Sequence, residues 1–181
     1  MPILGVIASG ISGHLVPPEN LAYESIATVT VGAGGSATAV FSSIPQTYQH
    51  LQIRGTATST AADAVLITFN GDSGSNYSRT RLASTGSAVG ASGGGTTTFW
   101  AVGSGFGFST TTSNSGMFVA DIHDYANTNK TKSLRGLMGY QGGIEFDSGN
   151  WLVNTAISSI TLTMSGGSWK QYSSFALYGI K

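Results

Sequence analysis

Alternation of apolar and polar side chains with a period of two residues is the feature that most constrains how this chain folds. The segment 160–164 reads ITLTM and the segment 174–178 reads SFALY, with Ser-Gly-Gly-Ser at 165–168 between them. Successive side chains of a β-strand point to opposite faces, so each segment predicts a strand with one apolar face. The positions predicted to be buried are Ile160, Leu162, Met164, Phe175 and Leu177. Together the two segments predict a β-hairpin.

The same alternation recurs along the chain and predicts about ten short strands joined by turns rich in Gly, Asn and Ser. The longer predicted strands are 26–31, 37–41, 50–55, 63–70, 77–83, 116–122 and 130–140, and shorter pieces are predicted at 99–102, 106–109 and 144–146. The first two strands are expected to form a hairpin around the glycines at 32–35. The tract STGSAVGASGGG at 84–95 has little apolar content and predicts an exposed loop. The predicted fold is a single antiparallel β-sandwich, all-β and jelly-roll-like.

The first fifteen residues, MPILGVIASGISGHL, contain no Asp, Glu, Lys or Arg. They are too few to span a bilayer, and they lack the positive region of a signal peptide. Pro17 and Pro18 then impose an extended backbone. We therefore expect an apolar arm at 1–18 and one β-sandwich domain at 19–181. The arm is expected to bury Ile3, Leu4, Val6, Ile7, Ile11 and Leu15, against another protein or against its own domain.

Charge is scarce and balanced in this sequence. Charged residues make up 9% of the 181, against about 25% in ordinary soluble domains. Eight basic and eight acidic residues leave no positive field for a phosphate backbone, which argues against a nucleic-acid partner. A net charge near zero favours association between copies. The chain has no cysteine, so disulfides and thiolate metal sites are excluded.

Candidate catalytic groups are present, but no pattern gathers them into a centre. Residues 90–94 fit the GxSxG pattern of a nucleophilic serine, yet they lie in a Gly/Ser tract with no helix to follow. A pair of carboxylates could cleave a glycoside, and the candidates are Glu24, Asp63, Asp72, Asp121, Asp124, Glu145 and Asp147. Glu145 and Asp147 lie two residues apart on a predicted strand, so they should share a face. We expect no catalytic residues and no cofactor.

The segment 121–129, DIHDYANTN, is the densest group of potential oxygen ligands. One interpretation is a calcium loop, and the other is a turn between strands capped by Asp124 and Asn127. The segment lacks the alternating carboxylates, central glycine and closing glutamate of the known calcium loop, which favours the turn. The histidines, which show no metal-ligand spacing, are His14, His50 and His123.

Aromatic side chains offer a further kind of site, because an exposed ring can support a sugar. The candidates for such a platform are Tyr77, Trp100, Tyr140, Trp151, Trp169 and Tyr172. In a β-sandwich, tryptophans more often belong to the core or to an interface.

Five stretches of the sequence resemble a family of small structural proteins of tailed bacteriophages. They are MPILGVIASGISGHL at 1–15, YESIATVTVGAGGSATAVFSSIPQTYQHLQIRG at 23–55, FNGDSGSNYSRTRL at 69–82, DIHDYANTNKTKSLRGLMGY at 121–140 and SITLTMSGGSWKQYSSFALYGIK at 159–181. The most specific are the arm, DYANTNK and FALYGIK. The resemblance implies a non-enzymatic subunit located in the virion, a homotrimer whose arm contacts other virion proteins of the tail, baseplate or capsid.

Two places on such a particle fit the sequence. The first is a tail-fibre or tail-tip subunit anchored by its arm, and the alternative is a capsid decoration (cement) protein. In the first case polar loops would contact a host-surface glycan without insertion into a membrane, since Ser, Thr, Gly and Asn suit adaptable recognition loops. The residues expected to make this contact are Thr58, Ser59, Ser87, Ser92, Thr97, Thr111 and Asn114.

Overall fold

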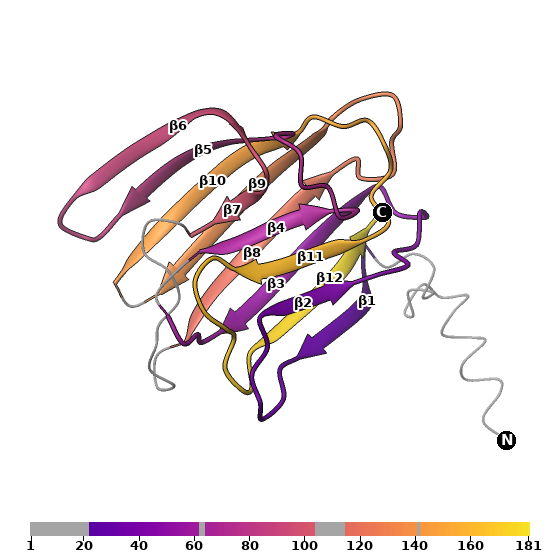
Figure 1. The fold of residues 1–181 in the computed structure, drawn as a ribbon. Helices are drawn as coiled ribbons and strands as arrows, with labels where there is room; N and C mark the ends of the chain where they lie inside the picture. The colour runs from indigo at the N-terminus through magenta and orange to yellow at the C-terminus, as the bar shows by residue number, and fades with distance from the viewer. Residues whose placement is uncertain (1–21, 62–63, 104–114, 141) are drawn as a thin grey trace, which may run out of the picture.

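The computed structural model describes residues 22–61, 64–103, 115–140 and 142–181, which form a two-layer β-sandwich (Figure 1). The strands are β1 (Tyr23–Thr30), β2 (Thr38–Phe41), β3 (His50–Ala57), β4 (Val65–Phe69), β5 (Tyr77–Ser84), β6 (Val89–Thr97), β7 (Trp100–Val102), β8 (Gly116–His123), β9 (Lys132–Tyr140), β10 (Gly143–Trp151), β11 (Ile160–Met164) and β12 (Ser174–Ile180). The prediction of an all-β, jelly-roll-like sandwich is confirmed. No helix in the described ranges is long and apolar enough to cross a membrane.

The strands pair antiparallel in two sheets of unequal size. The larger sheet has eight strands in the order β1-β12-β3-β8-β9-β10-β5-β6, and the smaller has four in the order β2-β11-β4-β7. Figure 1 shows the four short strands lying over one face of the large sheet. The opposite face of the large sheet is called its outer face below.

Both predicted hairpins are wrong, because the chain changes sheets at each of them. Strand β11 pairs with β2 and β4 in the small sheet, whereas β12 pairs with β1 and β3 in the large one. Likewise β1 lies in the large sheet and β2 in the small one. The connections at 31–37 and 165–173 therefore bridge the two layers at one end of the sandwich (Figure 1).

The core lies between the sheets and consists of the side chains that the alternation predicts. The five predicted positions of the last two strands are all buried, from Ile160 to Leu177. They pack with the inward side chains Leu51, Ile53, Ile67, Phe69, Phe118, Ile122, Leu134 and Met138. Each such buried side chain stabilises the fold by about 1.5–3 kcal/mol relative to exposure.

Residues 89–95 of the glycine-rich tract belong to strand β6, which corrects the prediction of a loop there, whereas the predicted exposure is confirmed for residues 85–95. Strand β6 pairs antiparallel with β5, from Ser84 opposite Val89 to Tyr77 opposite Thr97, with one irregularity near Thr80. Main-chain hydrogen bonds need no side chain, so low apolar content did not prevent pairing. The strand predicted at 106–109 and the arm at 1–18 lie outside the described residues.

Candidate functional site

The outer face of the large sheet carries a contiguous group of exposed apolar side chains. We call it the outer apolar patch, and its members are Leu82, Val89, Met117, Leu137, Ile144 and Phe146, with exposed fractions between 39% and 75%. One cross-strand row runs from Leu137 through Phe146 to Leu82. Directly opposed side chains on one face of a sheet lie in contact distance, so this row is continuous across β9, β10 and β5.

A second apolar row runs beside the first toward the edge of the sheet. The row crosses β8, β9, β10, β5 and β6 through directly paired residues. In this order they are Met117, Gly139, Ile144, Ser84 and Val89. A shallow apolar hollow lies by the first row, lined in part by Leu82, Ala91, Arg135 and Phe146. A sheet face that contacts only water is usually polar. This face is apolar and has a hollow instead.

Polar side chains border the patch on the side of β3 and β8. Asp121 accepts a hydrogen bond from Nε2 of Gln52 at 2.7 Å, and its Oδ2 lies 2.7 Å from Nη2 of the exposed Arg135. Gln52 in turn accepts from Nε of Arg54 at 2.7 Å. The network fixes the polar margin and places the exposed Arg135 guanidinium next to the apolar rows.

The inner face of the large sheet holds a buried group of charges on β5 and β10. Glu145 and Asp147 are almost fully buried and share a face, as their spacing predicts. Nη2 of Arg79 lies 2.5 Å from an oxygen of each carboxylate, and Arg81 approaches Glu145 at 3.7 Å. Burial raises the pKa of Asp147 to about 7, although Arg79 beside it favours the ionised form.

This arrangement is that of a structural ion cluster. A glycosidase needs its two carboxylates on either side of the scissile bond, with access for the sugar. Here the guanidinium of Arg79 lies between Glu145 and Asp147, within hydrogen-bond distance of both. The second oxygen of Asp147 accepts from the main-chain N–H of Gly103 at 3.2 Å. The oxygens that would do chemistry are therefore bound by the protein's own donors.

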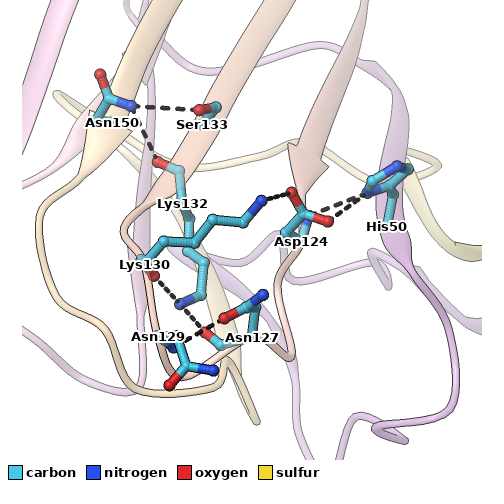
Figure 2. A network of polar contacts seen from close by, with 8 residues as sticks. All are labelled: His50, Asp124, Asn127, Asn129, Lys130, Lys132, Ser133 and Asn150. Atoms are coloured by element: carbon cyan, nitrogen blue, oxygen red, sulfur yellow. Dashed lines mark hydrogen bonds and ion pairs between the residues drawn. The ribbon is translucent and has the colours of Figure 1, made fainter.

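Lys132 is fully buried. Figure 2 shows its side chain close to Asn127 and Lys130. Its Nζ donates to the carbonyl oxygens of Asn127, Lys130 and Asn154 at 2.5, 3.0 and 3.1 Å. Burial lowers the pKa of Lys132, and the negative charge of Asp124 opposes this shift. The ammonium group occupies the kind of oxygen cage that would otherwise suit a metal ion.

The segment forms a turn in which the Asn127 N–H donates to the Asp124 carbonyl at 3.0 Å, and the Asn127 side chain caps it, which agrees with the second interpretation for Asn127. Oδ2 of Asp124 lies 2.6 Å from Nζ of Lys130, and the Asp124 N–H donates to Nδ1 of His50 at 3.0 Å (Figure 2). Oδ1 of Asn127 accepts from the N–H of Asn129 at 2.8 Å. The hydrogen bond from Lys130 holds the pKa of the Asp124 carboxyl below its usual range. Oδ2 of Asp124 and Oδ1 of Asn127 therefore have donors from the chain itself, which favours the turn over the calcium loop.

Replacing Lys132 by Met is expected to lower the free energy of unfolding by about 2–4 kcal/mol, because three carbonyl oxygens lose a charged donor. Lys130→Met is the matched control, since it removes a largely exposed ion pair and should cost less than about 1 kcal/mol. Urea denaturation read by tryptophan fluorescence measures both. Equal losses in the two variants would contradict a special role for the Lys132 contacts.

The residues expected to contact a host surface do not form one site. Thr58 and Ser59 are buried, which corrects their prediction as surface contacts. The Thr58 carbonyl accepts from the Lys170 N–H at 2.9 Å, and Ser59 pairs with Trp169 in an isolated bridge. Both residues thus bind the connection between β11 and β12 at the end of the sandwich. Their Ser/Thr composition suggested a loop, but composition does not reveal such pairing.

The other predicted contact residues lie elsewhere. Ser87 and Ser92 are exposed on the β5–β6 hairpin, and Thr97 is half-buried at its end. Ser92 is also the serine of the GxSxG pattern, and it lies within strand β6 and not at a strand-to-helix turn. The residues outside the described ranges are Ile3, Leu4, Val6, Ile7, Ile11, Leu15, Thr111 and Asn114.

The aromatic candidates separate clearly by burial. Those that are fully buried, and therefore belong to the core, are Tyr77, Trp100, Trp151 and Trp169. Tyr140 is half-buried. Tyr172 is 80% exposed, the most exposed large apolar side chain among the described residues.

The outer apolar patch was not identified from the sequence, although a signal for it exists. In GMFVADI at 116–122, apolar residues occupy both phases of the alternation, because Met117 and Val119 alternate with Phe118 and Ala120. Leu137 precedes Met138 in the same way. A strand with two apolar faces predicts burial on both faces.

Comparisons with known proteins find little. No protein-family model and no curated protein matches the sequence. The fold is similar to the marine PL-14 alginate lyase from Aplysia kurodai, with 11% identity, 96% of this chain and 92% of that chain covered, and a TM-score of 0.37. It is also similar to alginate lyase Aly36B, with 13% identity, 84% and 78% covered, and a TM-score of 0.34.

These comparisons correct the function predicted from the sequence. No family model or curated protein of bacteriophage virions matches, and the two structures named above are alginate lyases. The prediction of a phage tail-fibre or tail-tip subunit, with capsid decoration as its alternative, is therefore wrong. At this low identity and TM-score, the likeness concerns the strand arrangement and carries no argument about activity.

Proposed function

We propose that this chain is a non-catalytic assembly module that binds a second copy of itself through the outer apolar patch. The observation that carries the proposal is the patch, with six large apolar side chains exposed together on one sheet face. Soluble monomers rarely expose contiguous apolar areas above a few hundred Å². Covering apolar surface stabilises a complex by roughly 25 cal/mol for each Å² removed from water.

The charge distribution favours a second copy of the chain as the molecule that covers the outer apolar patch. The patch contains no charged side chain, and the whole chain has a net charge of zero, so two copies approach without repulsion. Across a two-fold axis the same apolar rows face one another and are complementary by symmetry. The exposed guanidinium of Arg135 at the margin then lies near the partner copy, where it supports register and not affinity.

Strand β6 extends the same surface to the edge of the sheet. It is the last strand in the order of the large sheet, and its residues 89–96 are exposed. Natural edge strands are commonly protected by charge or proline, yet VGASGGGTT contains neither. An edge strand is complementary to a copy of itself in antiparallel pairing. Both the face and the edge therefore suit self-association.

The non-catalytic part of the proposal rests on how the charged groups are used. The paired carboxylates Glu145 and Asp147 are buried against Arg79, and Asp124 is bound by Lys130. His50 and His123 stack edge-to-face with ring centres 4.9 Å apart, and His50 accepts a main-chain N–H. Each of these groups stabilises the fold through a contact that a catalytic role would have to break.

Sedimentation velocity of the full chain over a wide concentration range tests the proposal. We expect a dimer that dissociates on dilution, because a two-fold axis relates the two copies. Hydrogen exchange at high and low concentration should then show concentration-dependent protection in β6, β9 and β10. A chain that stays monomeric at its highest soluble concentration would overturn the proposal.

A further inference from the structure

We infer a second, independent site: the connection 168–173 presents Tyr172 as a stacking platform for a pyranose ring of an oligosaccharide. Tyr172 is 80% exposed at the end of the sandwich where both layer-bridging connections lie. This end is remote in the sheet order from β5, β6 and β10, which carry much of the outer apolar patch. An exposed aromatic ring with a polar tip is suited to a ligand that has both an apolar C–H face and hydroxyl groups.

The backbone of Tyr172 is held in a conformation that L-residues seldom adopt, with φ at 71°. Its N–H donates to the Val31 carbonyl at 3.0 Å, and the Val31 N–H donates to the Ser173 carbonyl at 2.8 Å. The Ser173 N–H closes a turn onto the Lys170 carbonyl at 3.1 Å. Strained residues persist where the surrounding structure fixes them, and they concentrate at functional positions. The ring is therefore presented by a fixed main chain.

The base of the same connection is anchored in the core. The Trp169 ring is fully buried and packs against Phe175 with ring centres 4.9 Å apart. Trp169 also exchanges two main-chain hydrogen bonds with Ser36, at 2.7 and 3.1 Å. The Thr60 N–H donates a hydrogen bond to the Ser168 carbonyl, and the Ser168 N–H donates one to Oγ1 of Thr60, both at 2.9 Å. A platform on such a base loses little conformational entropy when a ligand binds.

An open hollow of about 470 Å³ lies beside Tyr172, and its size suits a small ligand. Its lining includes Gly34 and Gly35 from the β1–β2 connection, Thr60, Lys170 and Gln171. The hydroxyl, amide and ammonium groups of the last three residues are of the kind that bind sugar hydroxyls. A Cβ at position 35 would come within 2.8 Å of the Trp169 carbonyl oxygen, so Gly35 is required for the close approach of the two connections.

A smaller hollow also includes Tyr172 in its lining, together with Thr56, Thr58, Ser115, Gln171 and Ser173 among others. Four of these five residues carry hydroxyl groups. Tyr172 therefore lines both hollows, and together they offer apolar surface, hydroxyl groups and an amide group around one exposed ring, as an oligosaccharide requires. The ligand class that matches it is an oligosaccharide of pyranose units.

Titration calorimetry of the full chain with neutral and uronate hexasaccharides of pyranose sugars tests this site. We expect binding to at least one of them, and a comparison of the neutral and uronate arms shows whether Lys170 contributes through its charge. Tyr172→Ala should weaken binding about tenfold or more, the change that corresponds to loss of one stacked ring, whereas Tyr172→Phe should retain most of it.

Tyr23→Ala is the matched control, because Tyr23 is also exposed but lies on β1 against Arg54. It should leave saccharide binding unchanged. Tyr172→Gly removes the ring and relieves the positive φ, so it shows whether any loss in Tyr172→Ala reflects misfolding. Absence of binding to every saccharide, or equal binding by wild type and Tyr172→Ala, would overturn the inference. The sedimentation of Tyr172→Ala should match that of wild type, so this test is separate from that of self-association.

Discussion

Phe146→Asp is expected to make the protein monomeric at concentrations where the wild-type chain self-associates. Phe146 lies in the middle of the row from Leu137 to Leu82, and half of its side chain is exposed. A carboxylate placed there would be desolvated between apolar surfaces without a partner. We expect the dissociation constant to rise by about a hundredfold or more, because an unpaired buried charge costs several kcal/mol. Sedimentation velocity measures the shift.

The control for this variant is Val40→Asp. Val40 lies on the small sheet with nearly the same exposed fraction, 49% against 51% for Phe146. The substitution adds the same charge to a different sheet, and it should leave the oligomer intact. Both side chains point away from the core, so both variants should unfold within a few degrees of wild type. Dissociation by both variants, or by neither, would refute the patch as the interface.

Much of the fold follows from a period of two residues. The inward set Leu51, Ile53, Leu134 and Met138 was predictable because each strand has one phase that cannot face water. Strand partners were not predictable in the same way. The alternation in β11 and β12 is equally compatible with pairing to each other or to strands of different sheets. The choice depends on the partners β2, β4, β1 and β3, which are distant in sequence.

In the candidate site, too, the sequence predicts some features and not others. The shared face of Glu145 and Asp147 follows from their spacing, but the guanidinium between them comes from β5. Arg79 lies near the two carboxylates because Gly149 pairs with Arg79 and Asp147 pairs with Arg81. This register between β5 and β10 cannot be predicted from the sequence of either strand alone. The β6 strand was missed for a different reason. Its side chains add little to the core, and its order comes from main-chain bonds to β5.

Arg79→Met is expected to lower the free energy of unfolding by about 3–5 kcal/mol at pH near 8, because it leaves two carboxylates buried without their shared guanidinium. The Nε and Nη2 of Arg79 donate to Asp147 and Glu145 at 2.7 and 2.5 Å, and both acids are almost inaccessible to water. Urea denaturation at two pH values measures the loss. Arg135→Met is the control, since Arg135 is exposed and its pair with Asp121 should be worth less than about 1 kcal/mol.

The stability that Asp147 contributes should depend on pH. In the folded wild type the pKa of Asp147 is about 7, against an ordinary value of 3.8, so the folded state binds this proton more tightly than the unfolded state. The resulting stability is fully present below the ordinary pKa, and it is lost as pH rises through the folded pKa. Wild type should therefore lose stability between about pH 4 and pH 7 through this group, and Asp147→Asn should remove that slope.

In Arg79→Met the folded pKa of Asp147 should rise further, because Arg79 favours the ionised carboxylate in wild type. At pH near 5 Asp147 of the folded variant would be protonated, and a neutral carboxyl group is far less costly to bury than a carboxylate. The destabilisation should therefore be much smaller at pH 5 than at pH 8. An equal loss at both pH values would mean that the cluster does not act through charge. It would then be a packing contact, and the burial of Glu145 and Asp147 would need another explanation.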